Sequence, residues 1–85
     1  MLRDSHAFSG FSVKDLEEAK QFYGETLGLD VELDDMGLKI NIAGGNPIFV
    51  YQTDDHEPAS FTILNFPVDT IDAAVDELTA KGVVF

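Results

Sequence analysis

The chain repeats one pattern of apolar residues at an offset of 55 positions, and this repeat limits its possible folds more than any other feature. Shifting the sequence by this distance aligns strand-like positions with each other and helix-face positions with each other. The aligned pairs are Phe8 with Ile63, Phe11 with Phe66, Val13 with Val68, Leu16 with Ile71, Ala19 with Ala74, and Tyr23 with Leu78. An internal repeat of this kind predicts two copies of one supersecondary unit.

The first copy, residues 1–52, reads as a strand, a helix and three further strands. Apolar residues among small ones predict the first strand over residues 7–13. Asp15 begins a capping box, apolar residues recur at helical spacing over residues 16–27, and Gly28 provides the left-handed cap that ends a helix. Alternation of apolar and polar residues predicts strands over residues 29–34 and 38–42. A turn and an apolar run then predict a further strand over residues 47–52.

The second copy, residues 60–85, follows a polar stretch over residues 53–59 that predicts a linker. Its pattern predicts a strand, a helix with Thr70 as N-cap and Gly82 as C-cap, and the beginning of the next strand. Two further strands, expected by analogy with the first copy, would lie after Phe85. We therefore predict an α+β fold in which a βαβββ module is repeated, the second copy is truncated, and both copies form one domain.

Composition and charge exclude several functional classes. Sixteen acidic residues against five basic ones give a net charge of -11, which repels the phosphate backbone of nucleic acids. The acidic residues are spread along the chain, which indicates a solvated surface or, alternatively, a salty cytoplasm. Without a long apolar run or a signal-peptide pattern, we expect a cytoplasmic protein with no membrane and no nucleic-acid partner. The absence of cysteine excludes disulfides, thiolate nucleophiles and thiolate metal sites.

A line of spaced residues combines a capped helix, an aromatic pair and a glycine that stops the helix. It consists of Val13, Asp15, Leu16, Ala19, Phe22, Tyr23, Leu27, Gly28 and Leu29. This line resembles the glyoxalase/bleomycin resistance/dioxygenase superfamily, also called the vicinal oxygen chelate superfamily. The resemblance implies that two βαβββ modules pair their curved sheets around a cleft. It also implies that the cleft often holds a divalent metal, which binds two neighbouring oxygens of the substrate.

The residues at the positions where the resemblance implies metal ligands are poor metal ligands. The first two positions hold Phe8 and Ile63, whose side chains have no lone pairs. The third falls near Val50 or Tyr51, where no carboxylate occurs, and the fourth would lie after the last residue. We therefore predict no cofactor. A divalent metal with displaced ligands is the alternative, and His6 is its candidate ligand, because residues two apart on a strand share a face.

Apolar and aromatic side chains with a few polar groups predict a small-molecule pocket. Phe8, Ile63 and Asn65 face the cleft by the parity that the resemblance implies, and Tyr51, like Asn65, interrupts an apolar strand. These four residues form the predicted ligand pocket, although a hydrogen bond from Asn65 to loop backbone or to solvent explains that residue equally well. His56 lies in a polar cluster that predicts a surface loop, where it could bind a cation only opportunistically.

Two functions follow from these patterns. The first is a metal-free module that sequesters a small planar or amphiphilic ligand, as bleomycin-resistance members of the superfamily do. The alternative is a metal-dependent lyase or dioxygenase. No catalytic residue is predicted, because the chain has no nucleophile elbow, phosphate loop or dinucleotide motif. The incomplete second copy leaves open sheet edges, so we also predict a homodimer, formed side by side through the first strands or by exchange of modules.

Overall fold

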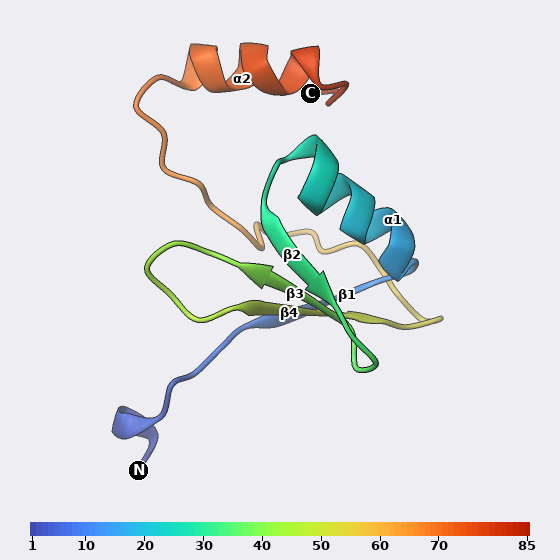
Figure 1. The fold of residues 1–85 in the computed structure, drawn as a ribbon, viewed down its shortest axis with the longest axis vertical. Coiled ribbons are helices and arrows are strands. Elements are labelled where there is room, and N and C mark those ends of the chain that lie inside the picture. Colours follow the sequence, from blue (N-terminus) through green and yellow to red (C-terminus); the bar gives the residue numbers. More distant parts are fainter.

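The first copy of the repeat folds into a four-stranded sheet with one helix across it (Figure 1). The computed structural model describes residues 1–85. Its elements are η1 (Leu2–Asp4), β1 (Gly10–Val13), α1 (Leu16–Lys20), η2 (Gln21–Thr26), β2 (Asp30–Leu33), β3 (Leu38–Asn41), β4 (Ile48–Gln52) and α2 (Ile71–Ala80). The predicted α+β order of strand, helix and three strands is confirmed, although β1 begins later than the predicted residue 7. No helix has the length and apolar character needed to cross a membrane.

The strands lie in the order β1-β4-β3-β2. β1 runs parallel to β4, and the other neighbours are antiparallel. The parallel pair arises because α1 and two strands intervene between β1 and β4, so the chain returns to the sheet in the same direction. In this pair Gly10 lies opposite Phe49 and Ser12 lies opposite Tyr51. The carboxyl ends of both strands therefore meet at one end of the sheet.

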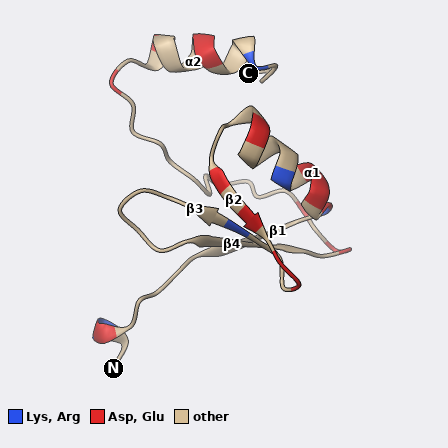
Figure 2. Cartoon of the chain, viewed as in Figure 1, with Lys and Arg blue, Asp and Glu red and all other residues tan.

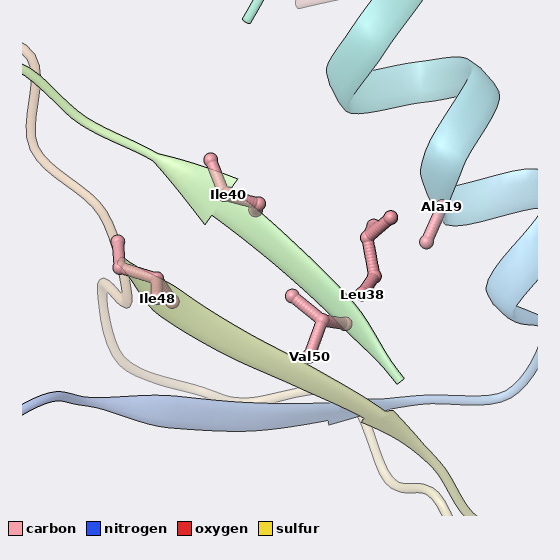
Figure 3. Close-up of a cluster of buried hydrophobic side chains, with 5 residues drawn as sticks. All are labelled: Ala19, Leu38, Ile40, Ile48 and Val50. Carbon is pink, nitrogen blue, oxygen red and sulfur yellow. The ribbon is translucent and has the colours of Figure 1, made fainter. Parts of the chain in front are cut away.

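The hydrophobic core lies between one face of the sheet and α1. Its side chains are Ala19 from α1, Leu38 and Ile40 from β3, and Ile48 and Val50 from β4 (Figure 3). Burying a valine, leucine or isoleucine side chain contributes about 1.5–3 kcal/mol. Side chains alternate between the two faces of a sheet, so the residues of β3 and β4 that lie between these core positions point to the other face, which α1 does not cover.

The start of α1 is held as the capping pattern predicts. Asp15 Oδ1 accepts hydrogen bonds from the backbone N–H groups of Glu17 at 2.9 Å and Glu18 at 3.2 Å. The backbone N–H of Leu16 donates to Gln52 Oε1 at 2.9 Å, which fastens the helix start to the end of β4. The Asp15 cap thus fixes the start of the helix, and the hydrogen bond to Gln52 fixes its position on the sheet.

The helix predicted over residues 16–27 changes form within its length. It is α-helical as far as Lys20 and then continues as a π-helical turn, η2. Gly24 lies in this turn, and a Cβ atom there would come within 2.9 Å of Val31 Cγ2. The turn and β2 therefore approach each other where the helix lacks a side chain. Gly28, at φ 74°, ends the segment as predicted.

The second copy forms its helix but not its strand. Residues 61–68 run without strand structure before α2, and residues 83–85 do not begin a strand either. A strand satisfies its backbone groups only by pairing, and no other segment of residues 1–85 pairs with this one. Thr70 occupies the predicted N-cap position of α2, but its side chain makes no capping hydrogen bond. Gly82 ends the helix at φ 94°, as predicted. The module bounds at residues 52 and 60 stay a prediction.

Candidate functional site

The uncovered face of the sheet carries the candidate site. We call it the open face and define it by the strand positions directed away from the core: Gly10, Ser12, Lys39, Phe49 and Tyr51. The rings of Phe49 and Tyr51 stack with centroids 6.2 Å apart and planes 21° apart. Gly10 lies close against this pair, because a Cβ atom there would be 3.1 Å from the carbonyl oxygen of Phe49 and 4.0 Å from the Tyr51 ring. The open face therefore offers an aromatic surface next to a position without a side chain.

One cavity, of about 320 Å³, lies beside Tyr51, and we call it the Tyr51 cavity. Its walls are mainly apolar and include Phe61 and Ile63, which lie in the segment between β4 and α2. Tyr51 and Ile63 are 44% and 42% exposed, so both can contact a ligand. The volume is at the lower end of the range of about 300–1,000 Å³ for small-molecule sites. The remaining lining residues are Gly10, Phe11, Ser12, His56, Glu57 and Ala59.

A serine–histidine pair and Glu57 supply the polar part of this cavity. Ser12 Oγ and His56 Nδ1 are 2.9 Å apart, and both residues line the cavity. If the hydroxyl donates to Nδ1, the other ring nitrogen, Nε2, carries the proton; if Nδ1 donates, the hydroxyl proton is free. In either tautomer the pair keeps one donor that it does not use internally. It can therefore bind an acceptor such as a carbonyl oxygen.

His56 was predicted as a surface-loop residue, and its place beside Ser12 was not foreseen. The loop is bound to β1, because the backbone N–H of Thr53 donates to the carbonyl oxygen of Val13 at 3.0 Å. The signal that could have revealed the pair is the parallel pairing of β1 with β4. It places the loop after β4 beside the end of β1, but parallel register cannot be read from one sequence.

Phe8 lies in a second cavity, of about 270 Å³, which we call the Phe8 cavity. Phe49 and Lys39 contribute to it from the open face. Asn46 Nδ2 donates to the carbonyl oxygen of Ala7 at 2.6 Å, which ties the turn between β3 and β4 to the segment before β1. His6 and Pro47 complete the lining. The stacked rings of Phe49 and Tyr51 thus face one cavity each.

The predicted pocket residues are consequently divided. Tyr51 and Ile63 share the Tyr51 cavity, Phe8 lies in the neighbouring cavity, and Asn65 lines neither. Asn65 is exposed and its side chain makes no hydrogen bond, while the preceding residue, Leu64, packs against the core. The role of these four residues in binding stays a prediction.

The side chains of the two cavities do not match the ligand set of a divalent metal. Protein metal sites usually use three or more oxygen, nitrogen or sulfur ligands, and no group of three His, Cys, Asp or Glu side chains converges in residues 1–85. Phe8 and Ile63 present only hydrocarbon to the cavities. His6, the candidate displaced ligand, shares its cavity with the Lys39 ammonium group, which repels a cation.

Comparisons with known proteins agree with this architecture. The family described as the Glyoxalase/Bleomycin resistance protein/Dioxygenase superfamily matches residues 5–85. Among solved structures, the crystal structure of a glyoxalase/bleomycin resistance protein from Streptomyces sp. CB03234 is similar with a TM-score of 0.66 and 30% sequence identity. The match covers 94% of this chain and 76% of that one. None of the curated protein sequences compared with the chain matches it.

Proposed function

Because the chain belongs to the glyoxalase/bleomycin resistance/dioxygenase superfamily, we propose that its open face binds a small organic molecule without a metal ion. One fold supports many activities, so the function has to be argued from the site. The observation that carries the proposal is the Tyr51 cavity, in which mainly apolar walls adjoin a serine–histidine pair and Glu57. The hydrocarbon side chains of Phe8 and Ile63 support the metal-free part of the proposal.

The shape and chemistry of the Tyr51 cavity define the ligand class. Tyr51, Phe61 and Ile63 provide apolar contact for a flat body. The Ser12–His56 pair provides one hydrogen-bond donor at the side of that body. A volume of about 320 Å³ limits the ligand to one or two rings. We therefore propose a neutral planar molecule that carries a carbonyl group, held by burial and by one hydrogen bond.

Acetophenone, with ethylbenzene as the hydrocarbon of similar shape, tests this proposal. In an NMR titration of the protein in EDTA, acetophenone should shift the amide signals of Ser12, Tyr51, His56 and Ile63. A neutral hydrogen bond contributes about 0.5–1.5 kcal/mol, so acetophenone should bind several times more tightly than ethylbenzene. Ser12→Ala combined with His56→Phe should remove this preference, because His56→Phe alone leaves the Ser12 hydroxyl free to donate. His6→Phe, in the other cavity, should retain it.

Two results would contradict the proposal. Acetophenone shifts that are absent or lie outside the Tyr51 cavity would show that the cavity is not the site. Binding that requires a divalent metal and disappears in EDTA would favour the lyase or dioxygenase alternative. Elemental analysis of the protein after dialysis distinguishes these cases, because a stoichiometric metal would accompany the second.

We also propose that the chain forms a homodimer and is located in the cytoplasm. Only six of 85 residues are buried, and large apolar side chains such as Phe61, Phe66 and Phe85 are exposed. β1 lies at one edge of the sheet, where its outer backbone groups can pair with a second copy. Sedimentation velocity should show a dimer at micromolar concentration, and a monomer at every concentration would contradict it. Cell fractionation would test the location.

A further inference from the structure

We propose that the Phe8 cavity is a second binding site, specific for a small aromatic carboxylate. It goes beyond the neutral ligand of the Tyr51 cavity and does not depend on it. The proposal rests on three features of this cavity: an ammonium group without an ion-pair partner, two aromatic walls, and a volume that fits a single ring.

The charge of the cavity differs from that of the rest of the molecule. Lys39 is the basic residue of the four strands, in a chain of net charge -11 (Figure 2). Glu32 lies directly opposite Lys39 on β2, but the two side chains do not form an ion pair within 4.0 Å. The ion pair in this structure joins Lys81 to Glu77. The Lys39 ammonium group therefore lines the cavity without a carboxylate partner. An incoming carboxylate would supply one.

Aromatic rings form the walls next to this ammonium group. Lys39 and Phe49 lie directly opposite each other on β3 and β4, so their side chains are adjacent on the open face. Gly37 leaves space for the Phe49 ring, because a Cβ atom there would lie 3.1 Å from Phe49 Cζ. Phe8 is 68% exposed and can close over a ligand that lies against Phe49.

These features select one class of ligand. The volume of about 270 Å³ is slightly below the usual range for small-molecule sites, which favours a ligand with one ring. An aromatic ring would lie between Phe8 and Phe49, and its carboxylate would reach Lys39. A cation is repelled by Lys39, and an inorganic anion would leave the two phenyl walls without a partner. A benzoate-like anion gives both the ammonium group and the phenyl walls a partner.

Benzoate and its neutral analogue benzamide test the proposal at pH 7 and constant ionic strength. In NMR titrations benzoate should shift the amide signals of Phe8, Lys39, Asn46 and Phe49, with an affinity in the millimolar range expected for so small a ligand. Benzamide should bind about tenfold more weakly, because a charged hydrogen bond is worth more than a neutral one. Lys39→Met should remove this preference and Lys39→Arg should retain it.

Lys20→Met is the matched control, because it makes the same charge change on α1, away from both cavities, and should leave benzoate binding unchanged. Equal affinity for benzoate and benzamide in the unaltered protein would overturn the proposal, whether or not any variant folds. Benzoate shifts confined to Ser12, Tyr51 and His56 would also overturn it. That result would still be compatible with binding in the Tyr51 cavity, so failure here is distinguishable from failure of the proposed function.

Discussion

The two copies of the repeat share a pattern of apolar residues but differ in what they form. In the first copy Ala19 of α1 is buried against the sheet, and four strands pair to form that sheet. In the second copy the aligned Ala74 is only half-buried, and the segment before α2 has no strand. A helix satisfies most of its backbone hydrogen bonds internally, whereas a strand depends on a neighbour. The same pattern therefore yields a helix in both copies and a strand in only one.

The packing of the two helices differs in the same way. α1 lies directly on the core residues of β3 and β4. Between α2 and the start of β2 there remains a cavity of about 220 Å³, lined mainly by apolar residues such as Leu29, Phe66 and Leu78. Figure 1 shows α2 at the far end of a long segment without strands. The free energy of unfolding should thus come mainly from the first copy, and the following substitutions test that inference.

Shortening a core valine should give the largest difference between the copies. Val50 is 0% exposed and Val68 is 50% exposed. Val50→Ala removes two methyl groups and leaves a cavity, so it should lower the free energy of unfolding by about 2 kcal/mol. Val68→Ala, the same change in the second copy, should stay within about 0.5 kcal/mol. Urea denaturation followed by circular dichroism measures both. Equal losses would mean that the second copy packs as firmly as the first.

The helix caps should show a smaller difference. Asp15 accepts two backbone hydrogen bonds at the start of α1, whereas Thr70 makes none at the start of α2. Asp15→Ala should therefore cost about 1 kcal/mol. Thr70→Ala should cost clearly less, because no cap bond is lost. The same denaturation experiment applies, and a loss from Thr70→Ala as large as that from Asp15→Ala would show that the second helix is capped after all.

Features that depend on local pattern were predictable from the sequence. The cap at Asp15, the helix stops at Gly28 and Gly82, and the alternation that buries Leu38 and Ile40 each follow from residues a few positions apart. The absence of a strand before α2 was not predictable in this way. The apolar pattern states which face a strand would bury, but it does not state whether a partner strand is available.

The candidate site was only partly predictable, because it depends on strand register. Phe8 and Ser12 are four residues apart, and an extended backbone of this length spans about 13 Å. Tyr51 pairs with Ser12, so it lies at the opposite end of the open face from Phe8. The sequence predicted one pocket for Phe8 and Tyr51, but it could not show that they line two cavities. The Ser12–His56 contact joins residues 44 positions apart and depends on the same register.

The smallest predicted effect concerns Tyr23, for which the second copy has the aligned Leu78. Tyr23 packs edge-on against Phe11, with ring centroids 5.9 Å apart, and burial raises the pKa of its phenol. The folded state therefore binds the phenol proton more tightly than the unfolded state does. The stabilisation is complete below the unfolded pKa of about 10 and is lost as the pH rises through the folded pKa. Tyr23→Phe should flatten this decline in the free energy of unfolding, measured by denaturation between about pH 8 and pH 11, a range that includes the unfolded pKa of tyrosine. Tyr51→Phe, on the open face, should leave the decline in place, and an unchanged decline in Tyr23→Phe would assign it to other groups.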